Sequence, residues 1–164
     1  MTTSTTLTTA QTATVKAFIL ADATLGPKTS GPGTDYGFIA DSMSSIAAPA
    51  FIVWKSNVSI GAVGDNFVGT ELAGLTAANQ TRLQTIAQFS PNGIDPSLAD
   101  RRAFFDDIFS SAAATRAKLL ALWKRSATRI EKVLATGTGS DAAPATMVYE
   151  GGVSINTVAD MFRV

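Results

Sequence analysis

The chain has 164 residues, which fits one domain by the usual range of about 100–200 residues per domain. Hydrophobic residues make up 46% of it, which supports a buried core and excludes wholesale disorder. Lys+Arg and Asp+Glu both number 13, so no net charge favours nucleic acid or a membrane, and only 16% of the residues are charged. A surface with so few charges is less costly to bury against another subunit, which favours an assembly component.

Histidine and cysteine are both missing from the sequence. Without cysteine there are no disulfides, thiolate nucleophiles or zinc–thiolate sites. Without histidine there is no Ser–His–Asp triad, and the commonest general base and transition-metal ligand are lost. We therefore expect a protein that is not an enzyme and that has no catalytic residues, no cofactor and no bound metal.

The amino terminus does not have the pattern of a signal peptide, because "MTTSTTLTTAQ" lacks a basic segment before an apolar core. The longest apolar stretches, such as "SIAAPAFIVW", are interrupted and fall short of the roughly 18–20 residues of a membrane span. We expect a protein that is made in, and soluble in, a cytoplasm and has no membrane partner.

Two helices are predicted in the first third of the chain. The first begins after Thr8, because Thr8 and Gln11 have the spacing of a capping box, and it ends at Gly26-Pro27. The second opens at Thr34-Asp35 and stops at Pro49. The apolar residues that recur at helical spacing are Val15, Phe18 and Ile19 in the first helix and Phe38, Ile39, Met43 and Ile46 in the second.

Residues 50–70 have the least helical pattern. The apolar run 51–54 is suited to an extended strand, and the sequence of residues 64–66 is typical of a tight turn. A short β-hairpin and a loop with one helical turn fit this segment equally well. The glycines at 61, 64 and 69 lack the Gly-Lys-Ser/Thr ending of a phosphate loop, so they predict no nucleotide site.

Three further helices are predicted. The third is capped by Thr76 and closed by residues 91–93, and Asp95-Pro96 opens the fourth. The fifth and longest runs from about Thr115 to Thr136. The apolar sets are Leu83, Ile86 and Phe89; Leu98, Phe104, Phe105, Ile108 and Phe109; and Leu119, Trp123, Ala127, Ile130 and Leu134. The predicted fold class is all-α, a helical bundle of about four to five helices with a hinged C-terminal arm.

Basic residues gather on one side of the fifth predicted helix, within about 60° of one another. They are Lys118, Arg125, Arg129 and Lys132. One interpretation is a surface that faces a polyanion such as the DNA backbone. The other is a solvated face partly paired with Asp100, Asp106 and Asp107, a common arrangement worth ~0–1 kcal/mol per exposed pair.

Asp106 and Asp107 invite a metal or acid–base hypothesis. Neighbouring residues on a helix project about 100° apart, so the two carboxylates diverge and cannot share a cation well. We therefore expect ordinary surface charge there.

The glycines at 137 and 139 follow a helix, whereas a dinucleotide-binding loop follows a strand and begins a helix. They are therefore interpreted as a helix stop and a flexible link. The predicted division is a helical body, residues 1–136, and a C-terminal arm, residues 137–164. The arm is too short to form a core of its own, so we expect it to dock on the body or on a neighbour. Its predicted partner-binding residues are Met147, Val148, Tyr149, Val158, Met161 and Phe162.

Several motifs lie along almost the whole chain. They are the opening "LTTAQ…VKAFILAD", "FIVWKSNV" at 51–58, "RSATRIEK" at 125–132, "TGTG" at 136–139, "PAT" at 144–146 and "EG" at 150–151. These motifs resemble a family of small proteins encoded among the virion structural genes of tailed bacteriophages and prophages. The resemblance implies no catalytic residue.

The resemblance implies a viral structural protein of the virion, made in the bacterial host cytoplasm, with the head–tail connector as its expected place. Small helical adaptor proteins of the phage neck form rings under the portal, and many place a terminal arm against it. The implied partners are further copies in a homo-oligomeric ring, the portal and tail proteins, and non-specific contact with passing DNA. Another tail component, a capsid decoration protein, an assembly chaperone and a small DNA-binding module are the alternatives.

Overall fold

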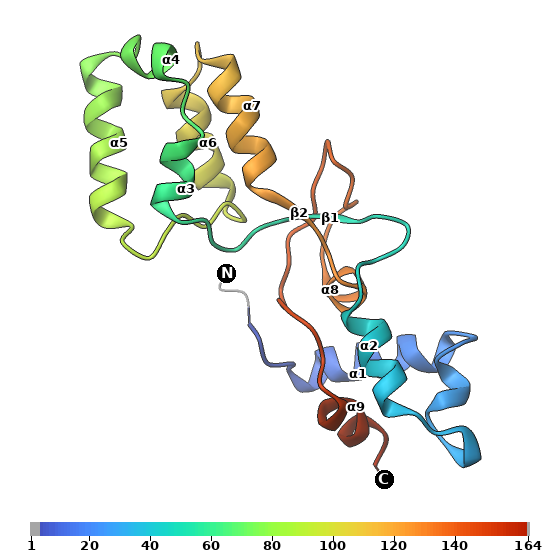
Figure 1. Cartoon of the computed structure of the whole chain (residues 1–164). Coiled ribbons are helices and arrows are strands. Elements are labelled where there is room, and N and C mark those ends of the chain that lie inside the picture. Colours follow the sequence, from blue (N-terminus) through green and yellow to red (C-terminus); the bar gives the residue numbers. More distant parts are fainter. Residues whose placement is uncertain (1–3, 164) are drawn as a thin grey trace. The chain divides into compact units, whose positions relative to one another are not determined.

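The computed structural model describes residues 4–163 of the chain, and these are mostly helical (Figure 1). The described residues form nine α-helices and one sheet of two short strands, so the expected helical class is confirmed, although the helices are shorter and more numerous than predicted. The chain divides into two units: unit 1 comprises residues 1–53 and 126–164, and unit 2 comprises residues 54–125. Unit 2 is therefore inserted into the sequence of unit 1. Within the described residues, no helix has the length and apolar character that crossing a membrane requires.

Unit 1 begins with a helix whose start the sequence predicts. The N–H of Gln11 donates to Thr8 Oγ1 at 3.2 Å, and the N–H of Thr8 donates to Gln11 Oε1 at 2.8 Å, so the capping box is confirmed. The helix ends before Asp22 rather than at Gly26. The helices of unit 1 are α1 (Thr9–Ala21), α2 (Tyr36–Ser44), α8 (Arg129–Leu134) and α9 (Ile155–Phe162), with 3₁₀ turns at Gly26–Lys28 and Gly31–Gly33.

The core of unit 1 is formed by residues from both of its sequence segments. Its buried members are Val15, Ile19, Leu25, Ile39, Ala40, Met43, Ile130, Tyr149, Val153, Val158 and Met161. Two residues predicted on the apolar side of α2 lie outside this core: Phe38 is 43% exposed and Ile46 is 67% exposed. The reason is that Ile39 and Met43, four residues apart, face the core, which turns Phe38 outward, while Ile46 follows the end of the helix.

The structure divides the chain differently from the predicted body, 1–136, and arm, 137–164. Residues of the expected arm complete the core of unit 1, because α9 packs against α1 and α2. The N–H of Val153 donates to Ser44 Oγ at 2.9 Å, and Ser154 caps α9. The apolar residues of this segment find their neighbours within their own unit.

Unit 2 consists of helices α3 (Ile60–Asp65), α4 (Gly69–Ala73), α5 (Ala77–Phe89), α6 (Ala99–Ile108) and α7 (Ala113–Leu122). Its core is aromatic: Trp123 is 2% exposed and meets the ring of Phe105 edge-on, with the centroids 5.3 Å apart. The predicted cap of α5 at Thr76 is confirmed. The helix expected at Asp95-Pro96 begins instead at Ala99, since the Asp95 carboxylate accepts a hydrogen bond from the N–H of Ser97 at 2.9 Å in a preceding turn.

The prediction of one long helix over residues 115–136 is wrong. The chain leaves α7 at Leu122 and forms strand β2 (Lys124–Ser126), which pairs with strand β1 (Ile52–Trp54). A new helix, α8, then begins, because Thr128 and Glu131 form a second capping box. The hairpin considered for residues 50–70 does not form either, since β1 pairs with β2 and a short helix, α3, follows Ser59.

Candidate interaction surface

The four basic residues predicted to form one stripe do not share a helix. Lys118 lies on α7 in unit 2, Arg125 lies in β2, and Arg129 and Lys132 lie on α8 in unit 1. The guanidinium of Arg129 forms an ion pair with Asp22, and it donates to Ser42 Oγ at 2.9 Å. The helix break at 123–128 therefore removes the single basic face expected to lie opposite DNA.

The residues predicted to bind a partner are mostly buried within unit 1. Met147, Tyr149, Val158 and Met161 are at most 6% exposed. Val148 and Phe162 are half-buried. The ring of Phe162 stacks on Tyr36 of α2, with the ring centroids 6.2 Å apart. These side chains are committed to their own unit and do not form an open patch.

The motifs that carry the resemblance meet in unit 1. Phe51 and Ile52, at the start of β1, form backbone hydrogen bonds to two different segments. The N–H of Ala127 donates to Phe51 O at 2.8 Å, and the N–H of Ala145 donates to Ile52 O at 2.9 Å. The N–H of Ile52 in turn donates to Gly139 O at 2.7 Å. Residues from four of the motifs thus join through their backbones.

A buried carboxylate closes the same framework. Glu131 is 1% exposed, and its Oε1 accepts from the N–H of Gly151 at 2.8 Å while its Oε2 accepts from the N–H of Thr128 at 2.8 Å. Burial, and secondarily the charge of Glu131, raise the pKa of Tyr149, whose hydroxyl donates to Gly152 O at 2.5 Å. These bonds give Glu131 a structural role, and they join the "RSATRIEK" and "EG" motifs at one junction.

The acidic residues do not assemble into a metal centre. Among residues 4–163, no three acidic side chains lie close enough together to hold a metal ion. Asp107 pairs with Arg82 at 2.6 Å and Asp106 with Arg116 at 3.4 Å, so the two neighbouring carboxylates point to different partners.

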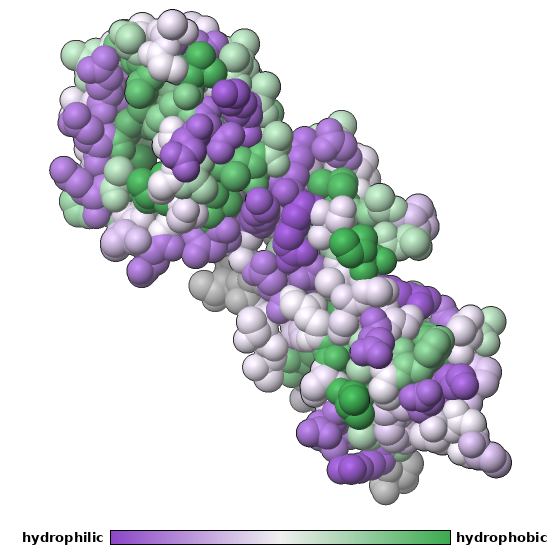
Figure 2. All heavy atoms as spheres, in the orientation of Figure 1, coloured by the Kyte–Doolittle hydropathy of each residue, from purple (hydrophilic) through white to green (hydrophobic). Residues whose placement is uncertain are grey.

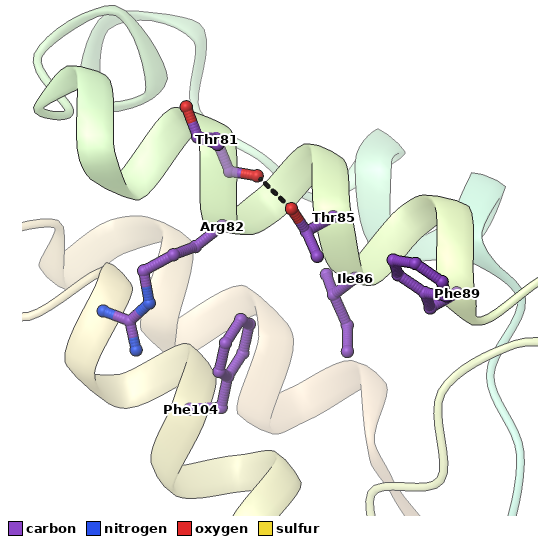
Figure 3. Close-up of a pocket in the computed structure, with 6 residues that line it drawn as sticks. All are labelled: Thr81, Arg82, Thr85, Ile86, Phe89 and Phe104. Atoms are coloured by element: carbon purple, nitrogen blue, oxygen red, sulfur yellow. Dashed lines mark hydrogen bonds between the residues drawn. The ribbon is translucent and has the colours of Figure 1, made fainter.

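One open apolar surface of unit 2 lies between α5 and α6. Phe89, at the end of α5, is 80% exposed. A hollow of about 180 Å³ lies beside it, and Figure 3 shows Ile86 and Phe89 of α5 on one side of it and Phe104 of α6 on the other. The guanidinium of Arg82 lies 4.9 Å from the centre of the Phe104 ring. The hollow therefore offers chiefly hydrocarbon to a ligand.

The threonines that line this hollow have no free hydroxyl donor. Thr85 Oγ1 donates to Thr81 O at 2.9 Å, drawn as the dashed line in Figure 3, and Thr81 Oγ1 donates to Ala77 O at 3.0 Å. Because both hydroxyls are bonded to the backbone of α5, the hollow has few polar groups left for a small polar substrate. It is better suited to an apolar side chain.

Two adjacent hollows extend this surface. One, of about 260 Å³, is lined by Phe89, Leu98 and Arg101 among others, and the next, of about 480 Å³, is lined by Leu98, Arg101 and Phe104 among others. Shared residues join the three hollows into one area, which we name the Phe89 surface: Ile86, Phe89, Leu98, Arg101 and Phe104. Figure 2 shows hydrophobic side chains gathered on unit 2, interrupted by polar ones.

The N-terminal half of α5 is anchored, and its C-terminal half is held by apolar contacts alone. Asn79 Nδ2 donates to Ile108 O at 3.1 Å, and Arg82 pairs with Asp107 of α6. From Leu83 to Phe89, no described side chain forms a hydrogen bond to another element. No residue of α5 is fully buried. This half of the helix is presented to the surroundings.

The sequence pattern placed Ile86, Phe89 and Phe104 on core-facing sides and missed this surface. One signal was present: α5 has few large apolar residues, and the rest of it is Ala, Thr, Asn, Gln and Arg. Such a helix has too narrow an apolar side to be covered fully by its own domain. No protein-family model matches the chain, and neither does any curated protein or solved structure.

Proposed function

We propose that the chain is a structural subunit of a tailed-phage particle and that it acts in the head–tail connector, as an adaptor or neck protein between portal and tail. The proposal rests first on the resemblance of its motifs to virion proteins. The observation that carries it further is the junction at Glu131 and Gly151, where those motifs bond to one another. Motif residues that hold the fold together are typical of a structural protein rather than of an enzyme.

Two further properties support an assembled subunit. The chain is poor in charge, and unit 2 exposes the Phe89 surface, whose apolar residues are costly to leave in water. Exposed apolar areas of this kind mark protein–protein contacts in soluble proteins. A non-catalytic role without cofactor or metal remains part of the proposal, since the sequence has neither histidine nor cysteine.

Contact with passing DNA has less support than contact with protein. Its basis was a single basic stripe, and the four basic residues lie on separate elements of the two units. We therefore propose that the partners are further copies of this chain and the portal and tail proteins. The proposed location of the chain is the virion.

Quantitative mass spectrometry of purified particles tests this proposal. The chain is expected in the particles of the phage or prophage that encodes it, at a small and fixed copy number equal to that of a ring. Deleting its gene is expected to leave filled heads and free tails that do not join. Complete infectious particles that lack the chain would overturn the proposal. A chain needed for assembly but absent from particles would identify an assembly chaperone instead.

A further inference from the structure

We propose that Asn92 is a site of spontaneous deamidation, which converts its side-chain amide into a carboxylate and redirects part of the main chain as isoaspartate. The inference does not depend on the proposed function, because the reaction needs only water and residues of this chain. Three observations carry it: the exposure of Asn92, the glycine that follows it, and the loose attachment of the helix before it.

Asn92 lies in an exposed turn that follows the end of α5. Pro91 and Asn92 are the central residues of this turn, and the N–H of Gly93 closes it by donating to Ser90 O at 2.9 Å. Pro at the second position and Gly at the fourth are typical of a β-turn. Within residues 4–163, the Asn92 amide has no hydrogen-bond partner. Its side chain is therefore able to rotate toward the nitrogen of Gly93.

The fold requires glycine at the next position. Gly93 has a φ of +106°, and a Cβ placed there would lie 2.1 Å from Asn57 Oδ1 and 2.7 Å from Val58 O. A residue with a side chain does not fit at this position unless the backbone moves. Glycine is also the residue that least hinders attack by its own nitrogen on the side chain before it. The reactive Asn-Gly pair is therefore built into the turn.

The reaction is an intramolecular attack. The backbone nitrogen of Gly93 loses its proton and bonds to Asn92 Cγ, which closes a five-membered succinimide ring, while the Cγ–Nδ2 bond breaks and the amide nitrogen leaves as ammonia. Water then hydrolyses the ring at one of its two carbonyl carbons. Hydrolysis at Cγ gives aspartate. Hydrolysis at the backbone carbonyl gives isoaspartate, in which the main chain runs through Cβ and Cγ and is one carbon longer.

The turn has to open before the nitrogen can attack, and its surroundings allow this. The bond to Ser90 O is the hydrogen bond that holds the N–H of Gly93. On the α5 side, the side chains from Leu83 to Phe89 form no hydrogen bond to another described element. Segments with few buried contacts open locally without global unfolding. We therefore expect Asn92 to react more slowly in the folded chain than in a free peptide, yet faster than the other asparagines.

The other asparagines lack this combination of features. Asn66 and Asn79 each donate from the side-chain amide to a backbone oxygen, at 2.9 and 3.1 Å respectively. Asn57 and Asn156 are exposed, but a β-branched residue follows each of them. A branched side chain crowds the backbone nitrogen that has to attack.

Isoaspartate at position 92 is expected to disturb the core of unit 2. Ile94 is 2% exposed, and it exchanges two backbone hydrogen bonds with Val58, both at 2.8 Å. One extra main-chain carbon is not easily absorbed at Gly93, because Asn57 and Val58 leave no space beside it. The two bonds between Val58 and Ile94 are therefore expected to weaken. Aspartate keeps the length of the main chain and should preserve them.

Ageing of the purified chain tests the inference. Both products carry a new carboxylate, so each changes the formal net charge from 0 to −1, and ion-exchange chromatography separates them from the parent. An acidic form is expected to accumulate faster in mildly alkaline than in mildly acidic buffer, because the attacking nitrogen has to lose its proton. Peptide mapping by mass spectrometry, with enzymatic methylation of isoaspartate, is expected to locate the change at residue 92.

Two glutamine variants provide the control. Asn92→Gln keeps the amide but has to close a six-membered ring, which forms more slowly, so its acidic form is expected to be lost. Asn156→Gln, at a matched exposed position, is expected to age as fast as wild type. A wild-type chain that forms no acidic species, or an Asn92→Gln variant that forms it at the wild-type rate, would overturn the inference.

Hydrogen exchange of the Val58 and Ile94 amides tests the structural consequence. The isolated isoaspartate form is expected to exchange faster than the parent at both amides. Asn92→Asp, which has the new charge without the longer main chain, is expected to exchange like the parent. Native protection in the isoaspartate form would overturn the expected weakening of the Val58–Ile94 bonds. These results are separate from the search for the chain in phage particles, so either proposal can fail alone.

Discussion

The backbone N–H of Gly151 donates a 2.8 Å hydrogen bond to the buried carboxylate of Glu131, 20 residues earlier in the chain. Glu131 also accepts from the N–H of Thr128, at the start of α8. One side chain thus fixes both the new helix after the β2 strand and the return of the C-terminal segment. This bond joins residues 137–164 to unit 1 together with the packing of α9 on α1 and α2.

Replacing Glu131 tests this role. Glu131→Ala leaves two backbone N–H groups without their acceptor, and each buried unsatisfied group costs about 1–3 kcal/mol, so we expect a loss of at least about 2 kcal/mol of unfolding free energy. Glu131→Gln keeps one acceptor oxygen and is expected to lose less. Urea denaturation measures both, with the exposed Asp65→Ala as control. A loss no larger than the control's would show that the bonds contribute little.

Removing residues 137–164 is expected to unfold unit 1, because Tyr149, Val158 and Met161 leave its core. The chain has two tryptophans, Trp54 and Trp123, and both belong to unit 2. We expect proteolysis within α1 and α2 while the tryptophan fluorescence of unit 2 stays near native.

Two point variants in α9 repeat this test without truncation. Val158→Asp places a charge at a position that is 0% exposed and is expected to unfold unit 1. Asn156→Asp, which is exposed, is expected to be neutral. Protease resistance of α1 and α2 in the truncated chain would show that the fold of unit 1 does not need residues 137–164. These residues would then form a separate arm, as the sequence predicted.

Two aromatic residues of unit 2 are expected to differ sharply in their contribution to stability. Trp123→Ala removes a side chain that is 2% exposed and packed on Phe105, and such truncations cost about 3–5 kcal/mol. Phe89→Ala removes one that is 80% exposed and should change the unfolding free energy by less than about 0.5 kcal/mol. Chemical denaturation followed by circular dichroism compares them. Equal losses would show that Phe89 is buried in solution.

Glycine at position 139 is required by its surroundings. Its φ is +66°, and a Cβ placed there would lie 2.2 Å from the ring of Phe51. Gly139→Ala is therefore expected to destabilise unit 1 by more than about 1 kcal/mol. Gly64→Ala is the matched control, because a Cβ at this position in α3 meets no atom within 4 Å, and it is expected to be neutral or stabilising. Similar melting temperatures for the two variants would contradict the close contact.

Acid is expected to weaken unit 1 through Asp22. Its carboxylate accepts from the N–H groups of Leu25 and Thr24 and pairs with Arg129, and these interactions lower its pKa from the ordinary value of 3.8. Because the folded pKa lies below the unfolded one, the stabilisation is present above about pH 4 and is lost as the pH falls through the folded pKa. Thermal melts from pH 7 to pH 2.5 measure this. Asp22→Asn should melt at a lower temperature than wild type at pH 7, and the two melting temperatures should converge in acid. A difference in melting temperature that stays constant from pH 7 to pH 2.5 would contradict the role of Asp22.

The sequence by itself determined where several helices begin. Thr8, Asp35 and Thr76 were each predicted as helix starts, and each caps a helix in the structure. A capping bond joins residues only three positions apart, so its partners are already in the sequence window. The helical class and the aromatic core around Trp123 followed from the same local periodicity.

The tertiary structure alone decided the break in the predicted long helix and the place of the C-terminal segment. The break occurs because backbone groups near Trp123 and Ala127 bond to Lys55 and Phe51, which are far away in sequence. A local window contains no sign of such partners, and helical periodicity continued across the break. The exposure of Phe89 likewise depends on how few elements cover α5, because the burial of a side chain is set by what packs over it.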